Sequence, residues 1–180
     1  FFLVKEGKNK EAIKVYNLIE EKIGVTEEIT NEKYLIFLKE SNITEAENEL
    51  VNLTEAHPNN LKYLNKLASF YLANKQPTEA IGIYEKILEK DPDDAKALMS
   101  LADYSKNNGE EEKYKEYSKR AFSNSNIGVD TKIAILYNYI QESEKDSSKL
   151  KEAYEYAELL VEAHPEEAKV WAIYGDIYNV

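Results

Sequence analysis

The chain has 180 residues, and its composition of 43% hydrophobic and 32% charged residues is typical of a folded, soluble protein rather than a disordered one. Its formal net charge of −11 argues against a nucleic-acid-binding protein, which needs a basic face, and is compatible with basic or neutral protein partners. It has no cysteine, which excludes disulfides and thiolate metal sites, and no apolar run approaching the roughly 18 residues that a membrane-spanning helix needs.

A small residue recurs at a fixed interval along the chain. Among its occurrences, the dipeptide Glu-Ala places alanines at Ala12, Ala46, Ala80 and Ala153. The first three alanines are 34 residues apart, and the last gap of 73 equals two such periods plus five residues. A second marker gives the same intervals, because Pro58 and Pro92 are 34 residues apart and Pro165 follows 73 residues later. The spacing therefore predicts repeats of 34 residues with one five-residue insertion.

In chain order, residues 1–24 are predicted to be a partial repeat with a turn at Gly7. Complete repeats are predicted at 27–60, 61–94, 95–128 and 129–167, the last with the insertion near 144–148, and a lone first helix at 168–180. The apolar first residues and the lone last helix lead us to expect flanking helices or paired ends. In 95–128, Tyr114 stands where the other copies have alanine, so altered packing is expected there.

Residues 61–94 are the clearest copy and contain two amphipathic helical patterns. The apolar face of the first consists of Leu64, Leu67, Ala68 and Tyr71. The apolar face of the second consists of Ala80, Ile83, Tyr84, Ile87 and Leu88. Neither helix can bury its apolar face alone, so each must pack against a neighbour. In the preceding copy, Thr44 and Glu47 have the spacing of a capping box at the start of the second helix.

The end of the chain carries the strongest resemblance to a known family. Trp171, Tyr174, Gly175 and Tyr178 stand where the tetratricopeptide repeat has Trp, Leu, Gly and Tyr, with Tyr174 the one departure. The resemblance covers essentially the whole chain. It implies an all-α fold, a right-handed α-solenoid of antiparallel helix pairs that forms a single array over residues 1–180. The composition is similar to that of exported bacterial members of the family, which favours the bacterial cell envelope (the periplasm) over the cytoplasm.

The resemblance implies that the chain binds a protein or peptide. In this family, the first helices of the pairs line a concave groove. The corresponding residues here are Asn31, Leu35, Lys62, Asn65, Lys66, Ser69, Lys96, Met99, Asp103, Ile133 and Tyr137. The lysines make the predicted groove neutral to weakly basic, which favours an acidic or C-terminal segment, with an ordinary polar surface as the alternative. The carboxylate clamp of one subfamily is excluded, because Leu35, Lys66 and Ser100 stand where it needs Asn, Asn and Arg.

No pattern in the sequence predicts an active site. His57 and His164 occupy the same place in their repeats and are expected at helix ends, where a cation suits the helix dipole. Glycine-rich phosphate loops, nucleophile elbows and His-Glu-x-x-His motifs are absent from the sequence. We therefore predict a non-enzymatic interaction scaffold without a cofactor. The alternatives are a regulatory or targeting arm of a larger multidomain protein or enzyme, and a module that self-assembles through its groove or its ends.

Overall fold

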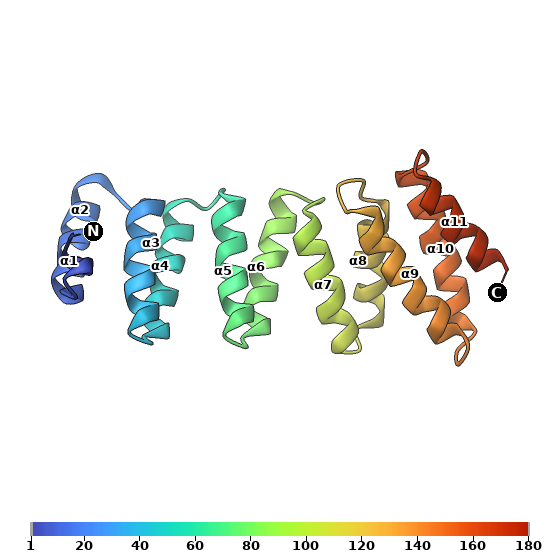
Figure 1. Ribbon diagram of the computed structural model, residues 1–180, viewed down its shortest axis with the longest axis horizontal. Helices are drawn as coiled ribbons and strands as arrows, with labels where there is room; N and C mark the ends of the chain where they lie inside the picture. The colour runs from blue at the N-terminus through green and yellow to red at the C-terminus, as the bar shows by residue number, and fades with distance from the viewer. Residues whose placement is uncertain (1, 180) are drawn as a thin grey trace. The chain divides into compact units, whose positions relative to one another are not determined.

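The computed structural model describes residues 2–179, which form helices and turns, and the chain divides into two compact units, 1–90 and 91–180. Unit 1 contains α1 (Phe2–Lys5), α2 (Asn9–Ile23), α3 (Glu27–Lys39), α4 (Ile43–Ala56), α5 (Leu61–Ala73) and α6 (Pro77–Lys90). Unit 2 contains α7 (Ala95–Asn107), α8 (Glu111–Ser123), α9 (Val129–Ser143), α10 (Ser148–Ala163) and α11 (Ala168–Tyr178) (Figure 1).

In unit 1, short turns join antiparallel helices that pack in succession: α3 on α4, α4 on α5, and α5 on α6. The alanines that mark the period lie in the second helices, α2, α4 and α6, and are buried: Ala12 is 2% exposed, and Ala46 and Ala80 are 0% exposed. Small residues at such positions let helix axes approach to ~8–10 Å. The fold class is as predicted, an all-α solenoid of antiparallel helix pairs.

A buried ion triad joins three helices of unit 1. Nζ of Lys33, on α3, lies 2.7 Å from Glu20 Oε2 on α2 and 2.8 Å from Glu49 Oε1 on α4. Burial acts to lower the pKa of Lys33, but hydrogen bonds with both carboxylates outweigh burial and leave the pKa raised. Burial raises the pKa of Glu49. The triad ties α3 to both of its neighbours.

In unit 2, α7 packs on α8, α9 on α10, and α10 on α11, while α8 also packs directly on α10. Ion pairs connect α8 and α10, since Lys119 Nζ lies 3.0 Å from Glu155 Oε2 and Lys115 Nζ lies 3.6 Å from Glu152 Oε1. Tyr114 is buried in the core of this unit, so the copy that lacks the alanine is indeed packed differently.

The turns within four helix pairs, α1–α2, α3–α4, α5–α6 and α7–α8, share one backbone conformation. Gly7, Ser41, Lys75 and Gly109 are spaced 34 residues apart, and their φ angles are 74°, 57°, 60° and 71°. This left-handed region is open to glycine and costs other residues roughly 1–2 kcal/mol. The repeat therefore imposes the turn geometry even on Ser41 and Lys75.

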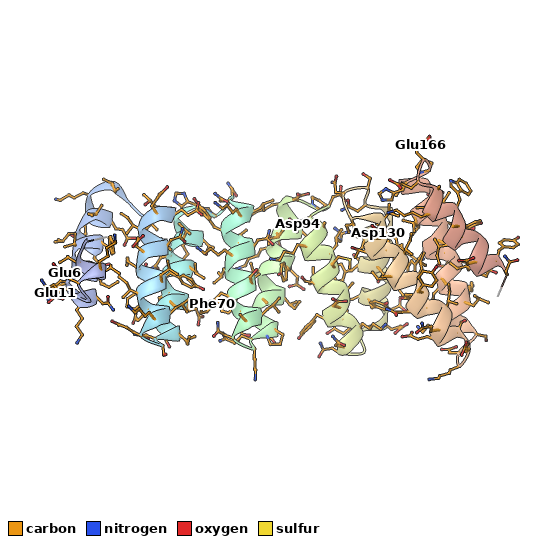
Figure 2. The ribbon with its side chains drawn as sticks, in the orientation of Figure 1. Glu6, Glu11, Phe70, Asp94, Asp130 and Glu166 are labelled. Atoms are coloured by element: carbon orange, nitrogen blue, oxygen red, sulfur yellow. The ribbon has the colours of Figure 1, made fainter. Side chains whose placement is uncertain are left out.

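An asparagine or aspartate side chain caps the start of three helices, α4, α5 and α7. Asn42 caps α4, where its Oδ1 accepts a hydrogen bond from the Glu45 backbone N–H at 3.4 Å. The predicted capping box of Thr44 and Glu47 is therefore wrong, because α4 begins at Ile43 and Thr44 already lies inside the helix. Asp94 caps α7 in the same way, at 2.8 Å from the Ala97 nitrogen (Figure 2).

Two glycines lie inside helices, Gly82 in α6 and Gly175 in α11. A Cβ added at either position would meet no atom within 4 Å, so neither glycine is required by a close helix contact. The small residues that are fully buried between helices are the alanines. The prolines that mark the period lie just beyond helix ends, since α4, α6 and α10 each end two residues before Pro58, Pro92 and Pro165.

Candidate functional site

The face that α3 and α5 share in unit 1 brings together three of the predicted groove residues. Nζ of Lys66 donates a hydrogen bond to Asn31 Oδ1 and lies 5.3 Å from the centre of the Tyr34 ring. Lys62 forms an ion pair with Glu27, with Nζ and Oε1 2.7 Å apart. Burial lowers the pKa of Lys66. Both lysines thus bind side chains of α3, but only Lys62 has its charge balanced, by Glu27.

The other predicted residues of this face are polar or isolated. Leu35 is 59% exposed on α3. Ser69 is exposed on α5 and donates a hydrogen bond to the Asn65 carbonyl at 2.7 Å, within its own helix. The α3–α5 face is therefore a mixed surface with one exposed apolar side chain.

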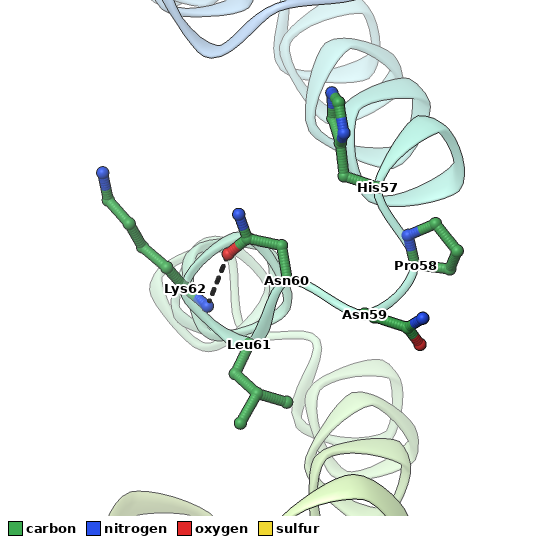
Figure 3. Close-up of a pocket in the computed structure, with 6 residues that line it drawn as sticks. All are labelled: His57, Pro58, Asn59, Asn60, Leu61 and Lys62. Carbon is green, nitrogen blue, oxygen red and sulfur yellow. Dashed lines mark hydrogen bonds between the residues drawn. The ribbon is translucent and has the colours of Figure 1, made fainter.

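A wide, open depression of about 680 Å³ lies beside this face, at the turn between α4 and α5 (Figure 3). Its polar groups are already bound within the protein. His57 Nε2 donates a hydrogen bond to the Val25 carbonyl at 3.0 Å, and Asn59 Oδ1 accepts one from Lys90 Nζ at 2.8 Å. Asn60 caps α5 by accepting from the Lys62 nitrogen at 3.1 Å. These contacts shape the turn.

Unit 2 contains a smaller and more enclosed cavity, of about 110 Å³, between α7, α8 and α9. It is lined by Met99, Ala102, Asp103, Lys106, Tyr114, Ser118, Ala121, Phe122, Ile135, Asn138 and Tyr139. Two of the predicted groove residues, Met99 and Asp103, lie in this lining. The lining combines apolar side chains with charged and hydroxyl-bearing ones, so the cavity offers both kinds of contact to a ligand.

Departures from the repeat on α8 create this cavity. Tyr114 stands where Ala46, Ala80 and Ala153 stand in other copies. Seven residues later on the same face, Ala121 stands where the other complete copies have Leu53, Ile87 and Leu160, all 0% exposed. Ser118 likewise replaces Leu50 and Tyr84 of the two preceding copies. Tyr114 is thus larger than the alanine of the other copies, whereas Ser118 and Ala121 are smaller than the residues that they replace. The space that these two residues leave is the cavity.

A pair of tyrosines fixes one wall of the cavity. The hydroxyl groups of Tyr114 and Tyr139 form a short, buried hydrogen bond that joins α8 to α9. Burial raises the pKa of Tyr139, and the hydrogen bond with Tyr114 adds to the rise. Nζ of Lys106 lies 5.7 Å from the centre of the Tyr114 ring and 5.9 Å from that of Tyr139, within cation–π range. The wall is held by contacts from three helices.

The remaining predicted groove residues lie outside the cavity. Lys96 is exposed on α7, and Ile133 is half-buried against the core of unit 2. Tyr137 is 47% exposed. The face of α9 that borders the cavity consists instead of Ile135, Asn138 and Tyr139, which sequence reasoning missed. Alignment of the copies could have found Ala121, since the other complete copies have leucine or isoleucine at its position.

The second histidine belongs to a structural junction. Lys132 is 1% exposed, and its Nζ donates hydrogen bonds to the Phe122 and Asn124 carbonyls at the end of α8, at 2.8 and 2.6 Å. Nζ also lies 3.0 Å from Nε2 of His164, the residue that ends α10. Burial and the charge of Lys132 lower the pKa of His164. The helix-end position is as predicted, but the cation there is Lys132 rather than His164.

Within residues 2–179, no group of three or more His, Cys, Asp or Glu side chains has the arrangement of a metal site. No helix in the same range is long and apolar enough to cross a membrane.

Comparisons with known proteins identify what the chain resembles. Residues 37–104 match a family model described as the tetratricopeptide repeat. The comparison with curated proteins gives no significant match.

Several solved structures share the fold. The structure titled "MamA RS-1 ArsTM double mutant" has 16% identity and a TM-score of 0.55, with 93% of this chain and 91% of that chain covered. A second MamA crystal structure has 19% identity and a TM-score of 0.51 over 94% of this chain and 82% of that one. The C-terminal part of a TPR repeat-containing protein from Cytophaga hutchinsonii has 16% identity and a TM-score of 0.50 over 98% and 67%. At these identities the likeness concerns the fold alone.

Proposed function

We propose that this chain, of which residues 37–104 match the tetratricopeptide repeat, is a non-enzymatic scaffold that holds a peptide or a partner protein against the first helices of its repeats. The cavity between α7, α8 and α9 carries this proposal. It is bordered by Met99 and Asp103, which lie on the face where the repeat pattern predicts a groove. Tetratricopeptide repeats build such faces by stacking helix pairs, and the side chains that the repeat does not dictate determine the ligand.

Site-specific cross-linking tests this proposal. A photo-reactive amino acid at position 99 should cross-link to a partner in cells that produce the protein. The matched control is position 116, because Glu116 lies on α8 with its side chain 64% exposed and is not part of the cavity lining. Adducts formed from position 99 and not from 116 support the proposal. Equal adducts from both positions, or adducts from 116 alone, contradict it.

Self-association is a second candidate function, favoured by an exposed apolar face on α2. Val15, Leu18, Ile19 and Ile23 follow one another at helical spacing and are 38–65% exposed. Contiguous apolar patches on a protein surface mark interaction sites. A second copy of the chain is the proposed occupant of this face. Light scattering over a range of concentrations tests it: Leu18→Glu should lower the average mass, whereas a constant monomer mass for the unmodified chain contradicts self-association.

A further inference from the structure

We propose that the cavity of unit 2 takes one aliphatic side chain of a peptide, and that a lysine or arginine beside it in the peptide pairs with Asp103. This inference rests on the proposed function and specifies the class of ligand at the same site. The cavity, the charges around it and the departures of α8 from the repeat support it independently.

The size of the cavity selects the side chain. An engineered protein cavity of about 150 Å³ lined by apolar side chains holds benzene. The cavity here, about 110 Å³, is somewhat smaller, so it matches a branched aliphatic group and excludes an indole ring. Phe122 and Ile135 provide apolar contact, while Ala102 and Ala121 leave the space open.

The origin of the space indicates where the ligand's side chain lies. In other copies the position of Ala121 holds the buried side chains of Leu53, Ile87 and Leu160. A leucine or isoleucine at this position is therefore compatible with the packing of these helices. A leucine or isoleucine of the ligand would fill the space that the small side chain of Ala121 leaves on α8. The residues at this position in the other copies thus indicate the size of the ligand side chain.

The charges at the cavity select the neighbouring residue. Lys106 has a carboxylate partner, since its Nζ lies 3.6 Å from Glu142 Oε1. Lys149, whose Nζ lies 5.8 Å from the centre of the Tyr139 ring, pairs with Glu152 at 3.1 Å. Asp103 is exposed, and its carboxylate makes no ion pair or hydrogen bond with any residue in the described range 2–179. The unbalanced charge beside the cavity is therefore negative.

An unpaired carboxylate at the rim of a pocket favours a cationic group and repels an acidic one. The net charge of −11 acts in the same direction over longer distances. We therefore expect a basic rather than an acidic ligand at this site. This expectation differs from the one that the predicted lysines raise, because the unpaired charge at this cavity is that of Asp103.

The cavity is also held open before a ligand arrives. The hydrogen bond between Tyr114 and Tyr139 spans α8 and α9, and Lys106 of α7 lies over both rings. Collapse of the space would break these contacts. A preformed pocket binds more tightly because little ordering remains to be done on binding.

Selection from a phage-displayed library of random 12-residue peptides, with the 180-residue chain as bait, tests the inference. Enriched peptides should contain a leucine, isoleucine, valine or methionine next to a lysine or arginine. Ala121→Leu restores the side chain of the other copies and should fill the cavity, weakening a selected peptide at least tenfold in fluorescence anisotropy. Asp103→Asn should weaken the same peptide several-fold and reduce the salt dependence of binding.

Asp176→Asn is the matched control, because Asp176 is the exposed aspartate at the same repeat position on α11, and it should leave the affinity unchanged. Thermal unfolding of Ala121→Leu checks that this variant is folded, and Asp103→Asn tests the charge on the surface independently of packing. Peptides that bind Ala121→Leu as tightly as the unmodified chain, or that are enriched in acidic residues, overturn the inference and leave the proposed function standing. Failure to enrich any peptide also overturns it, since it specifies a linear peptide, and the cross-linking experiment then decides the proposed function separately.

Discussion

The ammonium group of Lys132 lies 3.0 Å from Nε2 of His164, with no carboxylate in the pair. An ammonium group can only donate, so Nε2 accepts, and the imidazole must be neutral. Burial lowers the pKa of Lys132 to about 8. Protonation of His164 would place two cations in contact at the junction of α8, α9 and α10.

This contact predicts that the protein loses stability in mild acid. The pKa of His164 is lowered by burial and by Lys132, with Glu167 and the Ile127 backbone acting in the opposite direction. The unfolded chain takes up the proton near pH 6.5, before the folded chain does, so stability is lost as the pH falls below that value. Urea unfolding at pH 7.5 and 5.5 measures the loss. His164→Gln keeps an acceptor for Lys132 and should lose less stability between these two pH values than the unmodified protein. His57→Gln should lose as much stability as the unmodified protein. Equal losses in the unmodified protein and both variants contradict the assignment to His164.

The buried triad predicts a strongly destabilising substitution in unit 1. Lys33→Ala would leave Glu20 and Glu49 buried without their cation. Removing one partner of a buried ion pair typically costs about 3–5 kcal/mol. Chemical denaturation should show a loss in this range, and Lys39→Ala, at an exposed position of the same helix, should change stability by less than about 0.5 kcal/mol. Similar values for the two variants would show that the triad contributes little.

For the variant Tyr114→Ala, the repeat pattern and the structure predict opposite changes in stability. The pattern favours alanine at this position, so a reading of the sequence alone predicts a gain in stability. The structure predicts a loss of about 3–5 kcal/mol, because the substitution enlarges the existing cavity and leaves the Tyr139 hydroxyl without its partner. Tyr137→Ala, at a 47% exposed position, serves as the control and should cost less than about 1 kcal/mol. Equilibrium unfolding in urea measures both, and a stabilised Tyr114→Ala variant would refute the packing described here.

The shared turn conformation predicts a stabilising change. Lys75 is exposed and has a φ of 60°. Gly7 and Gly109 adopt the same left-handed conformation at the equivalent positions of other turns. Lys75→Gly removes the strain of the side chain at the cost of a more flexible unfolded chain, so a net gain of about 0.5–1 kcal/mol is expected. Asn74→Gly, one residue earlier at a φ of −95°, should instead destabilise the protein. Thermal melts of the two variants should therefore shift in opposite directions.

The helices and their spacing could be predicted because the same residue types recur at the same packing positions in several copies of the repeat. Ala46, Ala80 and Ala153 were identified by interval alone, and all three are fully buried. The buried lysines could not be predicted in this way. Lysine is seldom buried, and Lys33 and Lys132 are buried only because carboxylates or carbonyl groups from neighbouring helices converge on them.

The repeat indicates the part of the candidate cavity that α7 lines, but not the part that α9 lines. Met99 and Asp103 on α7 follow the repeat, so their position could be inferred. On α9, the side chain that lines the cavity is Tyr139, which is joined to Tyr114 by a hydrogen bond over 25 residues of sequence. A periodic pattern contains no information about such a contact. The positions inferred from the period, Ile133 and Tyr137, lie outside the lining.

The exchange of sizes on α8 also constrains how this copy can evolve. Tyr114 and Ala121 depend on one another, since alanine at position 114 enlarges a void that leucine at position 121 would fill. The effect on stability of a substitution at either position therefore depends on which residue occupies the other. Because each copy contacts only its neighbours, such a linked pair lets one copy acquire a new specificity while the rest of the array keeps its ancestral packing.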